Sequence, residues 1–188
     1  MEESPVGCWT NHHSFVEYKG QWYLFYHHND FSPDFDKNRS VRIDKVSFRE
    51  DGTIIPVKPT WRGVGYFKAS DELNIDRYSE CVGAKIDYLD EYNYFAGWKT
   101  RFTQPYDRVT FNEVDFGDKS PSKVVIRARG DNAALRISAG SVGKNIIIPA
   151  SADWAVFEVP TSMKVTGMQD ICVELVDGAC EVDWISFR

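Results

Sequence analysis

The sequence predicts an all-β protein in which a short antiparallel meander precedes a larger β-sandwich. Two observations carry this prediction. Short apolar runs alternate with polar residues at a period of two, and glycines and prolines separate these runs at regular intervals. No long stretch has the 3.6-residue period of an amphipathic helix. With 188 residues, of which 43% are hydrophobic and 14% aromatic, the chain has enough apolar surface for one or two domains with a real core.

The first part of the chain is expected to form the meander. Lys19-Gly20 is typical of a tight turn between two alternating runs, and Asp51-Gly52 of a second turn. A loop at residues 29–38, rich in Asp, Asn, Ser and Pro, is expected to be exposed. The expected strands are residues 14–18, 21–27, 39–48 and 53–57.

A linker rich in proline and glycine, residues 56–68, follows the meander. We place the domain boundary near Gly65, which gives domains at residues 1–64 and 65–188. Beyond it, short strands recur with turn signals between them, as in a two-sheet sandwich. The expected strands are residues 73–79, 83–88, 93–98, 108–115, 122–129, 134–138, 144–148, 154–159, 170–176 and 180–187.

Asp177-Gly178 is expected to turn the last two strands into a hairpin. Cys172 and Cys180 would then lie on opposite faces, unable to bond to each other, so we expect mostly free, buried thiols. Ile171, Val173, Leu175, Cys180, Val182 and Trp184 would form the core face. In this register Glu174 lies opposite Glu181, which destabilises a sheet. Either the register differs, or a cation such as calcium or a Lys or Arg side chain neutralises the pair.

Composition excludes several classes of function. The net charge of −6 and the isoelectric point near 5.2 argue against nucleic-acid binding, which needs a basic face. No apolar run reaches the ~18 residues of a transmembrane helix. No signal peptide is visible at the N-terminus.

All four histidines, His12, His13, His27 and His28, lie at the ends of the first expected hairpin. A metal site is one interpretation. The other is that they are polar strand-end residues, because no Cys or carboxylate completes a zinc set at a suitable spacing. His12 and His13 are adjacent, so in a strand they would point to opposite faces.

The first part resembles the last blade of the family 43 glycoside hydrolases. The matching runs are residues 11–15 (NHHSF), 17–27 (EYKGQWYLFYH), 39–41 (RSV) and 50–54 (EDGTI). The resemblance implies a partial β-propeller blade from a five-bladed, inverting enzyme that cleaves arabinose- or xylose-containing glycans. It also implies that His12 lies at the propeller axis, near calcium or its waters, and that Arg39 points into the substrate pocket.

The chemistry of that family is not expected within this chain. An inverting glycosidase needs an acid and a base roughly 6.5–9.5 Å apart, and in the family these carboxylates lie in earlier blades. Neither Glu2 nor Glu3 belongs to a recognisable acid or base motif, and Glu17 and Asp44 are interpreted as ordinary surface charges. We therefore expect no catalytic residue here and, as partner, the missing N-terminal blades. The family is usually exported, so the absent signal peptide indicates a chain that has lost its front end.

The second part, residues 70–188, resembles a family 6 carbohydrate-binding module, which implies a lectin-like β-sandwich of the jelly-roll kind. The matching runs are residues 75–79 (IDRYS), 114–117 (VDFG), 167–175 and 182–187 (VDWISF). The resemblance implies a structural calcium held by the first and last strands, here Asp76 and Asp183. It also implies a cleft in which two aromatic rings sandwich a sugar, beside an Asn near the final Asp-Trp.

Trp154 is the candidate for one ring, because aromatic faces stack on the CH faces of sugars, and Tyr94 or Trp98 for the other. A Trp at the start of a strand is also commonly a core residue. Glu181 takes the Asn position, and Arg108 replaces an aromatic residue before the middle strand.

These residues together predict the C-terminal part of a glycosidase acting on arabinose- or xylose-containing plant polysaccharides such as xylan and arabinan, with a carbohydrate-binding sandwich. The alternative is a stand-alone, non-catalytic glycan-binding module.

Overall fold

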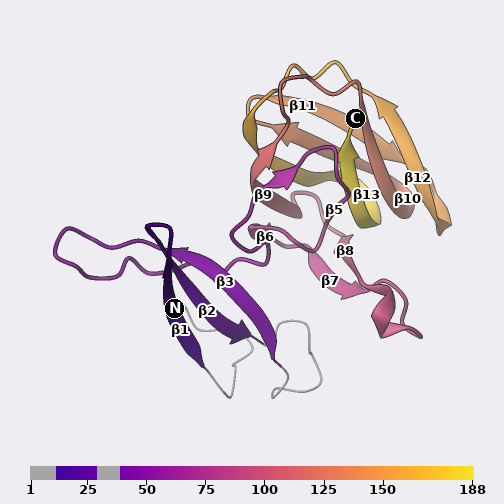
Figure 1. The fold of residues 1–188 in the computed structure, drawn as a ribbon. Coiled ribbons are helices and arrows are strands. Elements are labelled where there is room, and N and C mark those ends of the chain that lie inside the picture. Colours follow the sequence, from indigo (N-terminus) through magenta and orange to yellow (C-terminus); the bar gives the residue numbers. More distant parts are fainter. Residues whose placement is uncertain (1–11, 29–38) are drawn as a thin grey trace. The chain divides into compact units, whose positions relative to one another are not determined.

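The computed structural model describes residues 12–28 and 39–188 (Figure 1). The expected loop at residues 29–38, Glu2, Glu3 and Cys8 lie outside the described residues. The chain divides into two compact units, residues 1–65 and 66–188. In the described part, no helix is long and apolar enough to cross a membrane, and the one helical element is a single 3-10 turn. The all-β prediction is therefore confirmed.

The first unit is a three-stranded antiparallel sheet in the order β1-β2-β3. Its strands are β1 (His13–Tyr18), β2 (Gln21–His28) and β3 (Ser40–Val46). Lys19 and Gly20 both have positive φ, +52° and +79°, as a tight two-residue turn requires. The prediction of a strand at 53–57 is wrong: this segment makes only one isolated antiparallel β-bridge, between Ile54 and Phe48.

Among the described residues, the two faces of this small sheet are buried to different extents. Leu24, Tyr26 and Val46 are buried on one face, against Val57. Register places Val16, Phe25 and Val41 on the opposite side, where they are 44%, 38% and 78% exposed. Within residues 12–28 and 39–65, few apolar side chains are therefore buried.

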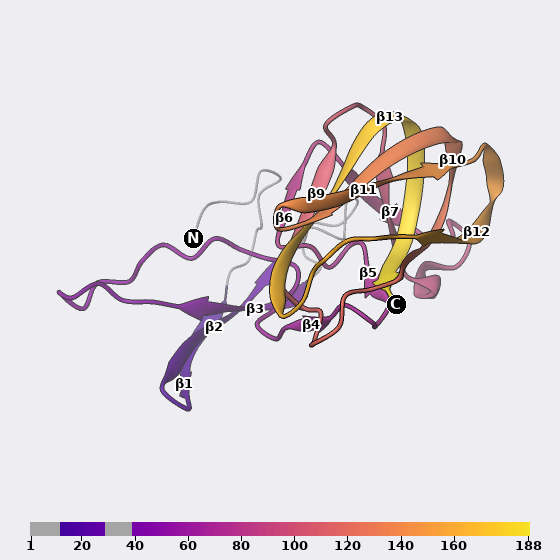
Figure 2. The ribbon, with the colours of Figure 1, turned by 90° about the horizontal axis from the view of Figure 1, so that it is seen from above.

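The second unit is a sandwich built on two long antiparallel strands, β10 (Lys123–Ala139) and β13 (Met168–Phe187). Figures 1 and 2 show both strands running side by side through the unit. The second half of β10 pairs with β11 (Val142–Ile148), and the first half with β12 (Ser151–Pro160). The two long strands thus belong to both layers.

The remaining strands extend these two layers. The first half of β13 pairs with β9 (Arg108–Asp115), and the second half with β8 (Trp98–Phe102) and β5 (Leu73–Asn74). Strand β8 continues to β7 (Lys85–Tyr88), and β9 to β4 (Phe67–Lys68) and β6 (Glu80–Val82). The expected strand at 93–98 is mostly the 3-10 turn η1 (Tyr94–Ala96), and that at 73–79 is short.

The expected final hairpin is wrong. Residues 177–178 do not reverse the chain: β13 passes straight through them, with an irregular register opposite residues 131–134 of β10. Cys172 accordingly lies opposite Ser138 and Cys180 opposite Gly130. The described cysteines, Cys81, Cys172 and Cys180, are free.

The core of the second unit lies between its two layers. Its largest fully buried side chains come from β5, β8, β9, β10, β11 and β13 and from Ile75, which follows β5. They are Phe102, Phe111, Leu73, Ile75, Ile126, Leu135, Ile137, Ile146, Ile148, Ile171, Leu175 and Ile185. Ile171, Val173, Leu175, Cys180 and Val182 are buried as expected. Trp184 does not continue this face: a register shift at residues 182–184 places it opposite Arg127 and turns Ile185 inward.

Candidate functional site

The candidate site lies on the outer face of the layer β7-β8-β13-β10-β12. Side chains alternate across a strand, so Thr100 and Phe102 of β8 point into the core, both 0% exposed, whereas Lys99 and Arg101 point out. Arg101 lies opposite Glu181 of β13, which lies opposite Arg129 of β10. The strand pairing therefore gathers charged residues from three strands into one row.

Glu181 is the centre of this row. Its carboxylate accepts a hydrogen bond from Arg129 Nε at 2.6 Å, and it lies 3.2 Å from Lys99 Nζ and 3.6 Å from Arg101 Nε. Arg101 in turn pairs with Asp87 at 3.4 Å. The clash expected between Glu174 and Glu181 does not occur, because β13 does not fold back; Glu174 instead lies opposite Arg108 and Arg136.

Trp154 of β12 joins this row through two arginines. The guanidinium carbons of Arg127 and Arg129 lie over its ring, 5.1 and 5.0 Å from the ring centroid, as in cation–π contacts. Arg129 thus contacts Trp154 and Glu181 together, and its Nη1 also donates to the Ala152 carbonyl at 3.3 Å. Trp154 is half-buried, so it is partly open to a ligand.

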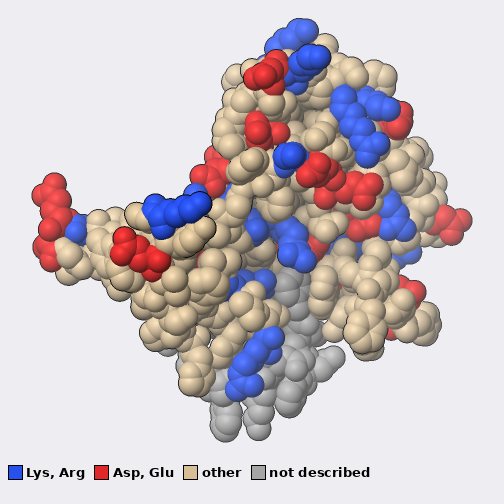
Figure 3. Space-filling model, in the orientation of Figure 1, with Lys and Arg blue, Asp and Glu red and all other residues tan. Residues whose placement is uncertain are grey.

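A cavity of about 460 Å³ opens beside Arg129 and Glu181. It is lined by Arg101, Phe102, Thr103, Arg129, Gly130, Asp131, Ser151, Ala152, Ala179, Cys180 and Glu181. Its wall offers guanidinium donors, carboxylate acceptors and a hydroxyl, which are the groups that orient a polyol. Across the visible face of the second unit, acidic and basic side chains are mixed (Figure 3).

Tyr94 and Trp98 lie apart from Trp154. Trp98 lies opposite Tyr88 on the side that Thr100 and Phe102 share, whereas Lys99 points to the side of Glu181. Tyr88 stacks on Trp98 at 4.5 Å and on Tyr94 at 4.3 Å between ring centroids. The structure therefore brings Trp154 and Glu181 together, and it groups Tyr94 and Trp98 elsewhere.

Tyr106 is a candidate that the sequence reading passed over. It is 73% exposed and has a φ of +74°, a conformation that non-glycine residues rarely adopt and that concentrates at functional sites. The buried Asp107 carboxylate accepts from the backbone of Thr103 at 2.8 Å and of Gln104 at 2.9 Å, and Tyr106 N donates to the Leu175 carbonyl at 2.8 Å. The loop next to the cavity wall is thus fixed. The Pro-Tyr-Asp run alone indicates a turn, not this backbone conformation.

The structure gives Asp183 a cationic partner, because Arg127 donates to its carboxylate. Burial raises the pKa of Asp183; Arg127 opposes this shift and Glu72 adds to it. Asp76 is buried and lies 3.4 Å from Arg77 Nε. Within residues 12–28 and 39–188, no three His, Cys, Asp or Glu side chains form a group able to hold a metal. Calcium at Asp76 and Asp183 stays a prediction.

In the first unit, His12 and Arg39 come to the same end of the sheet. His12 immediately precedes β1 and Arg39 immediately precedes β3, on either side of the end of β2. The rings of His12 and His27 lie 6.1 Å apart, and the ring of His13 contacts Phe15 edge-on. The roles of His12 and Arg39 in a substrate pocket stay predictions.

Asp44 is not a surface charge. It is 6% exposed and accepts hydrogen bonds from Tyr26 Oη at 2.6 Å and from the Thr60 hydroxyl at 2.5 Å. The pKa of the Tyr26 hydroxyl is raised, first by burial and then by this carboxylate. Asp44 therefore holds the segment after the sheet against its packed face.

Comparison with known proteins identifies what both units are similar to. No family model matches the chain. A segment of 55 residues is 44% identical to Xylosidase/arabinosidase 43A of Humicola insolens, and one of 54 residues is 46% identical to a beta-xylosidase of Xylanibacter ruminicola. Each match covers 29% of this chain, and the chain spans only 17% of the length of each relative.

Solved structures cover more of the chain. A family 43 arabinoxylan arabinofuranohydrolase from Bacillus subtilis, in complex with cellotetraose, superposes with a TM-score of 0.63 and 17% identity over 95% of this chain and 40% of its own. A family 6 carbohydrate-binding module from Clostridium stercorarium, in complex with cellobiose, superposes with a TM-score of 0.57 and 21% sequence identity. The match covers 65% of this chain and 96% of that module. A family 36 carbohydrate-binding module in complex with calcium and xylotriose superposes with a TM-score of 0.50 and 16% sequence identity, over 63% of this chain and 99% of that module. The resemblance to family 43 glycosidases and to family 6 modules, and the all-β fold, are confirmed.

Proposed function

We propose that this chain is the C-terminal part of a family 43 type glycosidase that acts on arabinose- or xylose-containing plant polysaccharides, and that its second unit binds glycan for that enzyme. The observation that carries the proposal is that Arg129 contacts both Trp154 and Glu181, while Arg129 and Glu181 line the 460 Å³ cavity. An aromatic ring next to fixed donors and acceptors is the usual construction of a sugar site. Xylan and arabinan oligosaccharides are the expected ligands.

In this proposal the two units differ in role. The second unit has its own core and the candidate site, so binding belongs to residues 66–188. The first unit carries His12 and Arg39 at one end of its sheet and an exposed apolar face, which the proposed N-terminal blades of the enzyme would cover. The acid and base of the reaction are assigned to those blades, and no catalytic role to the described residues.

The tested property is glycan affinity, measured by isothermal titration of the chain with xylan and arabinan oligosaccharides. We expect Trp154→Ala to weaken binding about tenfold or more, because a buried aromatic contact dominates such a site. Ile147→Ala, which removes an exposed side chain of β11, is the matched control and should bind as the unaltered chain does. Loss of affinity in both variants, or no binding of either glycan by the unaltered chain, would contradict the proposal.

A further inference from the structure

We propose that the tip of the β7–β8 hairpin, formed by Tyr92 and Phe95, is a second glycan-contacting surface that recognises a neutral polysaccharide chain apart from the cavity beside Glu181. This inference rests on the proposed function. It concerns a different element, because the rings of this hairpin stack on the side of β8 that carries Trp98, not on the side that carries Lys99.

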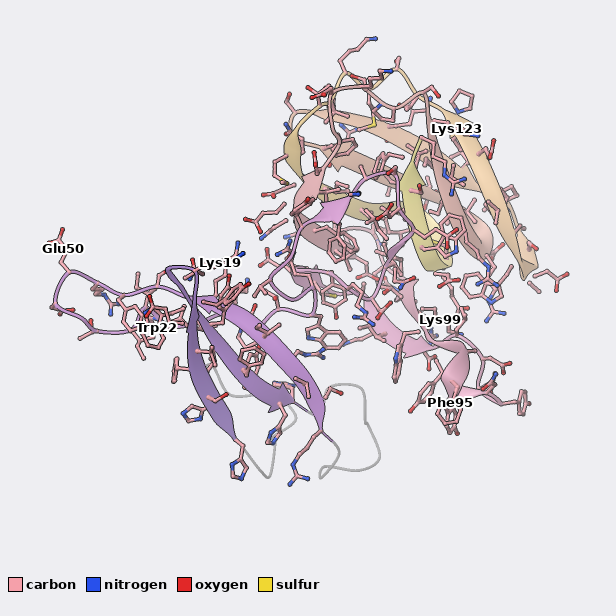
Figure 4. The ribbon with its side chains drawn as sticks, viewed as in Figure 1. Lys19, Trp22, Glu50, Phe95, Lys99 and Lys123 are labelled. Atoms are coloured by element: carbon pink, nitrogen blue, oxygen red, sulfur yellow. The ribbon has the colours of Figure 1, made fainter. Side chains whose placement is uncertain are left out.

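The tip presents aromatic rings to solvent. Phe95 is 100% exposed, Tyr92 94% and Tyr94 63%. In Figure 4, Phe95 lies at the outer end of the hairpin, which projects from the sandwich. A phenyl ring that is fully exposed contributes no burial to folding, so stability does not explain its presence there.

These rings stand on an ordered loop. The Asp90 carboxylate accepts from Tyr92 N at 2.8 Å, and the Asn93 side chain caps η1 by accepting from Phe95 N at 3.2 Å. Leu89 N donates to the Gly97 carbonyl at 3.0 Å and closes the loop. A backbone that is already ordered loses less conformational entropy when a ligand binds.

The stack behind the tip supports this arrangement. Trp98, Tyr88 and Tyr94 lie ring on ring, with interplanar angles of 26° and 27°. Trp98 and Tyr88 belong to the two paired strands of the hairpin, so the stack links the loop to the sheet. The backbone of Phe95, one residue after Tyr94, is thereby connected to the strands of the sandwich.

The chemistry of the tip favours a neutral glycan. Aromatic faces stack on the CH faces of sugars, and the exposed carboxylates of Asp90 and Glu91 can accept hydrogen bonds from sugar hydroxyls. The same carboxylates repel phosphate and anionic lipid. Two protruding side chains fall far short of the ~800 Å² per partner that a stable protein interface buries. A polysaccharide, which offers many repeats of one sugar face, needs no larger patch.

The test compares polysaccharide with oligosaccharide binding by the full chain. In the Tyr92→Ala/Phe95→Ala variant we expect depletion onto insoluble xylan or arabinan to weaken about tenfold or more, because a second contact acts by avidity. Titration with short oligosaccharides should match the unaltered chain. Trp154→Ala should weaken both. Ile147→Ala is the control for removal of an exposed apolar side chain, and unchanged thermal unfolding would show that the hairpin variant is folded.

Two results would overturn the inference and leave the proposed function standing: unchanged polysaccharide binding by the hairpin variant, or an equal loss of oligosaccharide binding, which would make the tip part of the first site. If the unaltered chain binds neither form of either glycan, the inference and the proposed function both fail.

Discussion

The two units bury their apolar residues in different ways. In the second unit, twelve large side chains are fully buried, and they come from strands of both layers. In the first, the buried cluster consists of Leu24, Tyr26 and Val46, with Val57 against it. The same kind of alternating sequence therefore forms a two-layered core in one unit and a single layer with one covered face in the other.

The exposed face of the first unit shows what a single layer lacks. Val16, Phe25 and Val41 share this face and remain exposed, although an antiparallel sheet that ends in water usually carries polar residues there. An exposed apolar face of this kind marks an interaction site in many proteins, and it favours aggregation when nothing covers it. The comparison teaches that the second unit buries its large apolar side chains between two layers, whereas the described part of the first unit buries a small cluster against one face of a single sheet.

The largest effect is expected from a matched pair of phenylalanines. Phe111 of β9 is 0% exposed, so Phe111→Ala should lower the free energy of unfolding of the second unit by about 3–5 kcal/mol. Phe25→Ala, at a position 38% exposed in the first unit, should change stability by only about 0.5 kcal/mol. Urea unfolding of the two variants measures both values. A similar cost for both substitutions would show that Phe25 is covered and would break the comparison.

A smaller effect is expected at the polar network around Asp44, which lies on the packed face of the first unit. Asp44→Ala removes the acceptor of Tyr26 and Thr60 and leaves their donors buried, which costs about 1–3 kcal/mol. Limited proteolysis should then cleave within residues 12–65 faster, with residues 66–188 unaffected. Glu17→Ala, an exposed carboxylate on β1, should leave the cleavage rate unchanged. Faster cleavage in both units would indicate that they do not unfold separately.

The smallest effect concerns a thiol of the second unit. Burial, with a further contribution from Glu181, raises the pKa of Cys180 to about 12. Because the folded pKa exceeds the usual value of 9.0, the thiol stays protonated at neutral pH. Its contribution to stability is fully present below pH 9.0 and is lost as pH rises from there through about 12. Since the thiolate is the reactive form, iodoacetamide at pH 8 should leave Cys180 unmodified until urea opens the unit. Mass spectrometry of the labelled peptides measures this, and rapid labelling without urea would show that the sandwich opens readily.

The sequence could not distinguish a turn from a bulge in the sandwich. Gly130 and Gly178 indicate breaks between strands, yet β10 and β13 run straight through them. A Cβ at Gly130 would lie 2.8 Å from the Ala179 carbonyl oxygen, and one at Gly178 would lie 2.8 Å from Ala133 Cα. These glycines allow two backbones to approach closely, a constraint that exists only once the strands are side by side.

The candidate site likewise has a part that the sequence predicted and a part that it did not. The residue types that suit a sugar, Trp154 and Glu181, could be identified from the sequence because their position before and within strands resembles a known module. The grouping of Trp154 with Glu181 could not be predicted, because it depends on Arg129. Arg129 lies opposite Glu181 and contacts Trp154 only once their three strands have paired. Tyr106 was missed because its backbone conformation is fixed by Asp107 and by Leu175, a residue far along the chain.

By itself the sequence determined the all-β class, the turn at Lys19-Gly20, the strand at 108–115 and the resemblance of each part to its family, because these follow from local alternation and turn chemistry. Only the tertiary structure decided which strands are continuous, that Asp44 is buried, and which charged residues face Glu181. Those properties depend on strand register between distant segments, and a shift of one residue moves every side chain to the other face.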